Sequence, residues 1–372
     1  MPRVDVPQKV SVPERLTRIE MQSPRAIDAR LERLGYRGQR QARKAAAILA
    51  YRHIQRLRRF HLYGAAPDPG TRQNCLFIGP TGCGKTYLIE LLFRDILEIP
   101  TILVDATQFS ETGYVGDDVN TILSRLFAQA GGDLAWASCG IVCMDEFDKL
   151  ATSRSDSRFA GQQTTKDVSG FGVQRGLLSL LSAQKADFPP DFGFTSRQPP
   201  LSMPLQCITF IACGAFSGFR GVVDQVDEEV RIGFGRNVKA RPPEAIAVEV
   251  IEEELTRTTA FARYGFLPEL IGRFNRLVAF APLDAGSLKA ILADGVLAEY
   301  QREFGEEGMT LEADEGVLDH IVERALRRET GARGLRAELA RSIEEAAYEH
   351  FGQGEPRTIC LRVRGDAIVA ES

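Results

Sequence analysis

The stretch Gly79-Pro-Thr-Gly-Cys-Gly-Lys-Thr86 decides the fold, because it fits the pattern G-x-x-x-x-G-K-S/T. It follows an apolar run, Cys75 to Ile78, and precedes a helical pattern, which is the context of a P-loop. Glycines let backbone N–H groups approach phosphate oxygens, and the start of a helix adds a favourable dipole. The motif predicts a nucleotide site formed by Gly79, Pro80, Thr81, Gly82, Cys83, Gly84, Lys85 and Thr86.

A second nucleotide motif is predicted at Ile141-Val-Cys-Met-Asp145-Glu146, an apolar run that ends in two carboxylates. Asp145 and the Thr86 hydroxyl are predicted to ligate magnesium, and Lys85 is predicted to reach the outer phosphates. Glu146 is predicted to polarise the attacking water, because hydrolysis needs a base in line with the outer phosphate. An isolated Asp-Glu pair is common at a solvated strand end, but its position downstream of a P-loop favours catalysis. The chain is therefore predicted to be an ATPase with ATP and magnesium as cofactors.

Further apolar runs predict an α/β fold whose parallel sheet is flanked by helices, because strands buried on both faces have nearly continuous hydrophobicity. The predicted strands are Cys75–Ile78, Thr101–Asp105, Gly140–Met144, Cys207–Ala212 and Arg276–Phe280.

Proline positions and helical periodicity divide the chain into three predicted segments. Residues 1–35 carry four prolines and are expected to form an irregular arm with at most a short helix. Residues 36–281 are expected to form the large nucleotide-binding domain. Helical patterns at 283–304, 315–328 and 334–351 predict a smaller, mainly helical C-terminal domain over residues 282–372, closed by a strand at Thr358–Val363.

Composition sets limits on the partners and on the compartment. A chain of 372 residues with 44% hydrophobic and 26% charged residues has the balance of an ordinary globular protein. The net charge of -4 gives no reason to expect a polyanion partner. The stretch from Tyr36 to Phe60 is basic and lacks acidic residues, and it is interpreted as a solvated helix face rather than a DNA site.

The seven cysteines form no Cys-x-x-Cys pair, so they are expected to be buried free thiols in a reducing compartment. The sequence contains neither a membrane-spanning run nor a signal-peptide core, and a cytoplasmic location without a membrane partner is expected.

In its order of motifs, the chain resembles the ClpX family of AAA+ unfoldases from roughly Gly38 to the end. The motifs, besides the two nucleotide motifs, are Gly113-Tyr-Val-Gly116, Asp167-Val-Ser-Gly-Phe-Gly-Val-Gln174, Ile232-Gly-Phe-Gly235, Leu267-Pro-Glu-Leu-Ile-Gly-Arg273 and Thr330-Gly-Ala-Arg-Gly-Leu-Arg336. The resemblance implies an AAA+ P-loop NTPase fold and a homo-hexameric ring. It also implies protein substrates that are threaded through a pore and passed to a ClpP-type peptidase.

The resemblance implies roles for individual residues. Tyr114 and Val115 would grip substrate in the pore, and Ser169 to Gln174 would form a second pore loop, where Phe171 departs from the usual acidic residue. Arg273 would be the arginine finger that reaches the neighbouring subunit's nucleotide, and Arg333 the sensor arginine of the small domain.

Two further sites are implied in the same way. Tyr36 aligns with the adenine pocket of the family, where it would stack on the base or instead pack in the hinge. The peptidase would be docked by Ile232, Gly233 and Phe234, unless these residues fold back on their own subunit.

Departures from the family leave the substrate open. No cysteine precedes Cys75, so the zinc-binding domain of full-length members is expected to be absent, either naturally or by truncation. The segment Asp187 to Pro200 lacks the basic loop that would recognise a substrate's C-terminal carboxylate. Two alternatives to a peptidase-linked unfoldase are a remodelling chaperone that docks no peptidase and a nucleic-acid motor or loader. The nucleic-acid motor or loader is favoured only by the basic stretch from Tyr36 to Phe60.

Overall fold

The chain forms two compact units, each containing segments that are distant in sequence. The computed structural model describes residues 10–20, 22–65, 72–109, 119–151, 168–190, 199–219, 221–223, 258–353 and 355–371. The first unit comprises Met1–Ile27, Ala42–Ile78 and Lys85–Ala279, within those described residues. The second comprises Asp28–Gln41, Gly79–Gly84 and Phe280–Ser372.

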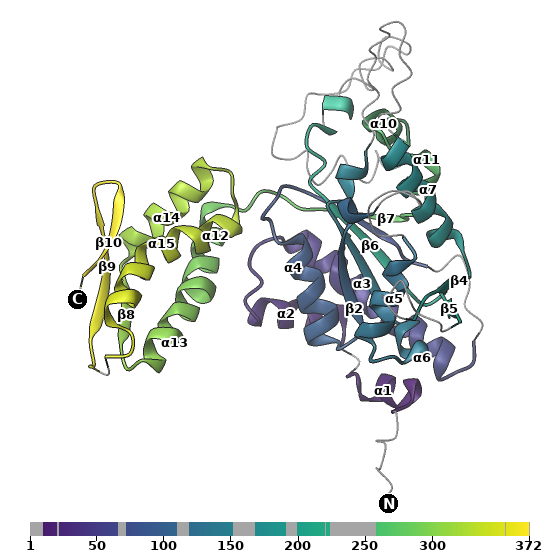
Figure 1. The fold of residues 1–372 in the computed structure, drawn as a ribbon, viewed down its shortest axis with the longest axis horizontal. Coiled ribbons are helices and arrows are strands. Elements are labelled where there is room, and N and C mark those ends of the chain that lie inside the picture. The colour runs from purple at the N-terminus through teal and green to yellow at the C-terminus, as the bar shows by residue number, and fades with distance from the viewer. Residues whose placement is uncertain are drawn as a thin grey trace, which may run out of the picture. The chain divides into compact units, whose positions relative to one another are not determined.

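The first unit is built on a five-stranded parallel sheet flanked by helices (Figure 1). The strand order is β2-β3-β6-β1-β7, and every neighbouring pair is parallel. The strands are β1 (Cys75–Ile78), β2 (Thr101–Asp105), β3 (Ile141–Asp145), β6 (Thr209–Gly214) and β7 (Arg276–Ala279).

The sheet confirms the predicted α/β fold. Its strands coincide with the five predicted apolar runs, with ends shifted by at most two residues. Strand β6 is buried along its whole length, as expected for a strand covered on both faces. Because β1, β6 and β3 are parallel neighbours, their C-terminal ends meet at one edge of the sheet.

The remaining elements of the first unit connect and cover these strands. Helix α4 continues directly into the π-helical segment η2, and β4 and β5 form a separate antiparallel hairpin. The elements that follow the N-terminal segment are α3 (Arg40–His61), α4 (Lys85–Ile89), η2 (Glu90–Ile96), η3 (Ala106–Gln108), α5 (Thr121–Gln129), α6 (Leu134–Ala137), η4 (Phe147–Leu150), α7 (Val168–Ser182), β4 (Lys185–Phe188), β5 (Leu201–Pro204), α10 (Thr258–Tyr264) and α11 (Pro268–Ile271).

The basic helix α3 corrects in part the expectation of a solvated helix face. Arg43 is only 6% exposed. Arg56 donates to the carbonyl of Cys207 at 3.0 Å and to the Thr209 hydroxyl at 2.7 Å. Arg58 donates to two backbone carbonyls of the N-terminal segment. These arginines hold the fold together, which leaves fewer charges on the surface than the sequence suggests.

A buried histidine connects α3 to the sheet. His53 Nε2 lies 2.9 Å from the carbonyl of Cys139, so this nitrogen carries the proton and donates, while Nδ1 lies 3.0 Å from the Thr209 hydroxyl. Burial, assisted by the charge of Arg56, lowers the pKa of His53 to about 3. The ring is therefore neutral at neutral pH.

The described part of the N-terminal segment is more helical than predicted. It forms α1 (Val12–Arg18) and α2 (Pro24–Arg33). Helix α1 begins with a capping box, in which the Ser11 side chain accepts from the Glu14 N–H and the Glu14 carboxylate accepts from the Ser11 N–H. Both helices carry proline in the first turn, where its missing N–H breaks no helical hydrogen bond.

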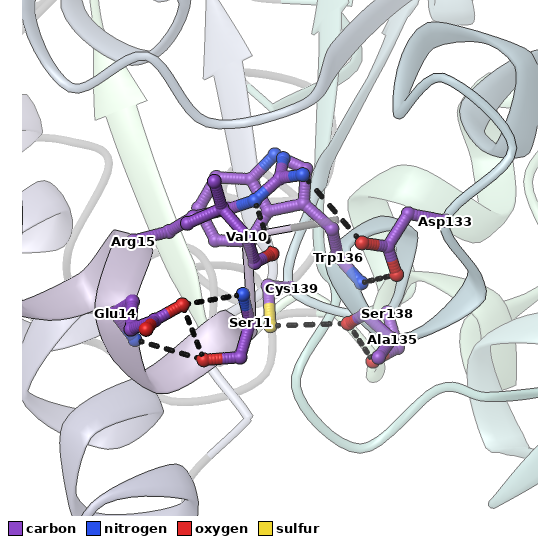
Figure 2. Close-up of polar contacts among 9 residues, drawn as sticks. All are labelled: Val10, Ser11, Glu14, Arg15, Asp133, Ala135, Trp136, Ser138 and Cys139. Carbon is purple, nitrogen blue, oxygen red and sulfur yellow. Dashed lines mark hydrogen bonds and ion pairs between the residues drawn. The ribbon is translucent and has the colours of Figure 1, made fainter. Parts of the chain in front are cut away.

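Helix α1 is held against α6 by an arginine–tryptophan contact (Figure 2). The Arg15 guanidinium lies 5.1 Å from the centroid of the Trp136 ring and 3.6 Å from the Asp133 carboxylate. The same carboxylate caps α6 by accepting from the Trp136 N–H at 3.1 Å. These contacts fix the N-terminal helix on the surface of the first unit.

The C-terminal part of the second unit combines helices with a small sheet. Its elements are α12 (Ala285–Ile291), η5 (Leu292–Leu297), α13 (Ala298–Glu306), β8 (Thr310–Ala313), α14 (Glu315–Arg327), α15 (Ala332–His350), β9 (Thr358–Arg364) and β10 (Ala367–Glu371). The predicted helices and β9 are present, whereas β8 and β10, which complete a three-stranded sheet with β9, were not predicted.

A buried carboxylate joins the two long helices of this part. Glu338 of α15, 6% exposed, pairs with Arg324 of α14 at 3.2 Å and with Arg328. The apolar core around these helices includes Leu288, Ile321 and Leu339.

Within the described ranges, no helix is long and apolar enough to cross a bilayer. All seven cysteines are free thiols, and six of them are buried. Among the residues that the structure describes, no three His, Cys, Asp or Glu side chains gather as a metal site.

Candidate nucleotide site

The predicted phosphate-binding loop joins β1 to α4. Strand β1 ends at Ile78 and α4 begins at Lys85, whose side chain is 8% exposed. Gly82 and Gly84 have φ values of +76° and +91°, which side chains larger than hydrogen rarely allow. The glycine spacing thus gives the loop a backbone path suited to presenting N–H groups to an anion.

Two side-chain oxygens that could ligate a metal meet between the first turn of α4, which carries Thr86, and the end of β3, which carries Asp145. The Thr86 hydroxyl donates to Asp145 Oδ2 at 2.8 Å, which brings together residues 59 positions apart. A hydroxyl and a half-buried carboxylate supply the hard oxygen ligands that Mg²⁺ prefers, and Mg²⁺ commonly uses few protein ligands beside substrate phosphates. The donor set therefore fits the predicted ion.

Glu146 leaves the strand in an unusual conformation. Its φ and ψ of 52° and 30° lie in the left-handed region, which costs a non-glycine residue about 1–3 kcal/mol. Its N–H donates to Asp145 Oδ1 at 2.9 Å, and its side chain is exposed. The turn separates the roles of the two adjacent carboxylates, since Asp145 is engaged with Thr86 while Glu146 is left accessible.

Comparisons with known protein families agree with this geometry. Residues 75–214 match the model of the ATPase family associated with various cellular activities (AAA), and residues 283–359 match the C-terminal, D2-small domain, of ClpB protein. The chain is an ATPase with an AAA domain, and the two matches together support a Clp/Hsp100-type AAA+ protein. The first match contains the phosphate-binding loop, Asp145 and Glu146, and the second contains Arg333.

A third carboxylate of this AAA+ ATPase has a structural part at the same edge of the sheet. Asp148 is buried and accepts from the N–H of Ala215, the residue after β6, at 3.1 Å. A Cβ added at Gly214 would lie 2.7 Å from the Asp148 carboxylate, so only glycine fits at the end of β6. No role was predicted for Asp148, although its place in Asp145-Glu-Phe-Asp148 was a signal that could have identified it.

The two predicted arginines are both exposed on their own units. Arg273 follows α11, and its carbonyl accepts from the buried Asn74 side chain at 3.1 Å. Asn74 also accepts from the N–H of Phe210, so it ties the backbone at Arg273 to strand β6. Arg333 is the second residue of α15.

Tyr36 lies against the phosphate-binding loop. Its side chain is 3% exposed, and its hydroxyl donates to the carbonyl of Gly84 at 3.1 Å. The sequence pattern could not identify this partner, because the two residues are 48 positions apart.

The remaining predicted site residues lie outside the described part of the chain. These are the pore residues Tyr114 and Val115 and the docking residues Ile232, Gly233 and Phe234. The segment from Ser169 to Gln174, predicted as a second pore loop, lies within helix α7, and Gln174 is fully buried. Gln174 is therefore a residue of the core and not of a pore loop.

Proposed function

We propose that this AAA+ ATPase is a ClpX-like protein unfoldase that forms a homo-hexameric ring and threads protein substrates through a central pore. The observation that carries the catalytic part is the 2.8 Å contact between Thr86 and Asp145, with the exposed Glu146 next in sequence. The match to a Clp small domain over residues 283–359 supports the choice of a protein substrate.

The residues divide the chemistry of hydrolysis among them. Loop N–H groups and Lys85 would hold the phosphates of ATP, while Thr86 and Asp145 would hold magnesium, which would neutralise charge on the phosphates. Glu146 orients the attacking water and accepts its proton. The left-handed turn at Glu146 supports this role, because it separates the base from the metal ligand.

Ring assembly would complete the site through Arg273. Negative charge spreads over the transferred phosphoryl group, and a fixed guanidinium from a neighbouring subunit stabilises it. The exposure of Arg273 and the anchoring of its backbone by Asn74 support a side chain that reaches outward from a fixed base. Arg333 is proposed as the sensor arginine of the small domain.

The route of the substrate rests on sequence motifs alone. We assign the substrate grip to Tyr114 and Val115, and the docking of a ClpP-type peptidase to Ile232, Gly233 and Phe234. Six identical docking loops would gain avidity from the ring.

Unfolding is tested with a fluorescent protein that carries a disordered tail at either end. The wild type should extinguish its fluorescence only with ATP and magnesium. Tyr114→Ala should keep ATP hydrolysis and lose unfolding, whereas Glu146→Gln should lose both. Unfolding that survives in Tyr114→Ala would remove the pore role from that residue, and ATP-independent loss of fluorescence would refute the motor.

A second assay adds a ClpP-type peptidase and follows degradation of the tailed protein. Phe234→Ala should abolish ATP-dependent degradation and spare both hydrolysis and unfolding. If the wild type unfolds the protein but binds no peptidase, the chain is a remodelling chaperone that works without one. The internal hydrogen bonds of Arg56 and Arg58 weaken the case for a nucleic-acid motor, because they occupy charges of the basic stretch.

A further inference from the structure

A loop that turns its N–H groups toward an anion points carbonyl oxygens the other way, and these need partners. Two carbonyls of the phosphate-binding loop have such partners within the second unit. The Gly84 carbonyl accepts from the Tyr36 hydroxyl, and the Gly82 carbonyl accepts from the Ala332 N–H, each at 3.1 Å.

The ring of Tyr36 also limits the space at Gly84. A Cβ added to Gly84 would lie 3.0 Å from the Tyr36 oxygen and 3.4 Å from carbon atoms of its ring. With 3% of its surface exposed, the ring has almost no free face on which a nucleotide base could stack.

Tyr36 stands on a segment that is itself fixed. The neighbouring Arg37 pairs with Asp294 at 2.8 Å. Gln39 exchanges two hydrogen bonds with the backbone of Ala281, at 2.6 Å and 3.1 Å. A hydroxyl on so anchored a segment holds its partner carbonyl in one place.

The turn before α15 fits against Gly82 just as closely. A Cβ added to Gly82 would lie 2.6 Å from the Thr330 carbonyl oxygen, and one added to Gly331 would lie 2.9 Å from the Gly82 oxygen. Gly331, the N-cap of α15, has a φ of +58° and caps the helix with no side chain. The N–H of Ala332, the first residue of α15, donates to the Gly82 carbonyl of the loop.

We propose that the Tyr36 hydroxyl and the Thr330–Ala332 turn are positioning groups that hold the phosphate-binding loop in its anion-binding shape, and that Tyr36 does not stack on the base. The inference rests on the ATPase activity of the chain. It assigns to Tyr36 an effect on every ligand that carries the triphosphate group, whatever base is attached.

The test measures dissociation constants of wild type and Tyr36→Phe for magnesium complexes of ATP, GTP and inorganic tripolyphosphate. Phenylalanine keeps the ring and removes the hydroxyl. All three constants should rise by one common factor of about 2 to 13, which corresponds to the ~0.5–1.5 kcal/mol of one hydrogen bond. Tyr264→Phe is the matched control, because its hydroxyl also donates to a backbone carbonyl, that of Ser217, at 3.1 Å. It should leave all three constants unchanged.

Two results would overturn the inference. One is wild-type affinity of Tyr36→Phe for tripolyphosphate, and the other is a loss confined to ATP, which would restore the base contact. A wild type that binds no ATP would instead contradict the ATPase assignment.

A second pair of variants tests the turn. Gly331→Ala should weaken tripolyphosphate binding, whereas Gly308→Ala, with a similar φ of +78° and no atom within 4 Å of the added Cβ, should only lower stability. Equal tripolyphosphate affinity in these two variants would overturn the role of the turn.

Discussion

The buried side chain of Gln174 joins two segments of the first unit by three hydrogen bonds, so the loss of stability on replacing it can be worked out from the structure. Its Nε2 donates to the carbonyl of Leu150 at 2.8 Å and to that of Gly265 at 3.1 Å. Its Oε1 accepts from the N–H of Leu267 at 2.8 Å. The side chain thereby joins the end of η4, which follows the catalytic carboxylates, to the start of α11, which precedes Arg273.

The change Gln174→Leu removes these bonds and leaves two carbonyls and one N–H buried without the partner they now have. Each polar group that loses its partner lowers the free energy of unfolding by about 1–3 kcal/mol, whereas burying the leucine side chain raises it by roughly 1.5–3 kcal/mol. We therefore expect the free energy of unfolding of the first unit to fall by about 3 kcal/mol. The rate of ATP hydrolysis should fall too, because the two joined segments lie next to Glu146 and Arg273 in the chain.

Urea titration followed by the fluorescence of Trp136 measures this change, since the chain has one tryptophan and it lies in the first unit. Gln55→Leu is the control, because Gln55 makes a single side-chain bond to the Tyr51 hydroxyl at 3.2 Å. It should cost about 1 kcal/mol or less. If the two variants unfold at the same urea concentration, the junction does not have the stability that its hydrogen bonds imply.

Two other predictions concern the subunit interface and pH. Arg273→Ala should lower the rate of ATP hydrolysis about 10³- to 10⁵-fold. Mixing Arg273→Ala subunits with Glu146→Gln subunits should recover part of the rate. Absence of recovery in rings shown to be mixed would make Arg273 structural. The pKa of His53 is lowered in the fold, so the unfolded chain binds the extra proton and stability should fall as pH drops from about 6.5 toward 3. His53→Gln should remove up to about 1.4 kcal/mol per pH unit from that slope in urea titrations, and an unchanged slope would contradict the buried neutral histidine.

The sheet and the catalytic motifs could be predicted from sequence because they are local. Each parallel strand is a nearly continuous apolar run, and the glycine spacing and the Asp145-Glu146 pair are read without knowing any distant contact. Strands β8 and β10 were missed since they are four and five residues long and only partly buried. The extent of helix in residues 1–35 was underestimated because the prolines were interpreted as breakers, whereas Pro13 and Pro24 occupy the first turns of α1 and α2.

The partners of buried polar side chains could not be predicted, because they depend on residues far along the chain. The charge of Arg56 predicts a position on the surface. Its hydrogen-bond partner Thr209 lies 153 positions away, so the sequence pattern does not show the contact. Tyr36 fits a base-stacking residue by type, but its contact with Gly84 appears only once the chain is folded. The composition of a segment gives its charge, whereas the tertiary fold decides whether that charge faces solvent.

The most direct test of the catalytic site compares ATP binding and steady-state phosphate release in wild type and Glu146→Gln. The amide keeps the size of the side chain but cannot accept a proton from water. The site assigned here predicts a dissociation constant for ATP close to that of the wild type and a turnover lower by about 10²-fold or more. Turnover at the wild-type rate in Glu146→Gln would contradict the assignment of Glu146 as the base.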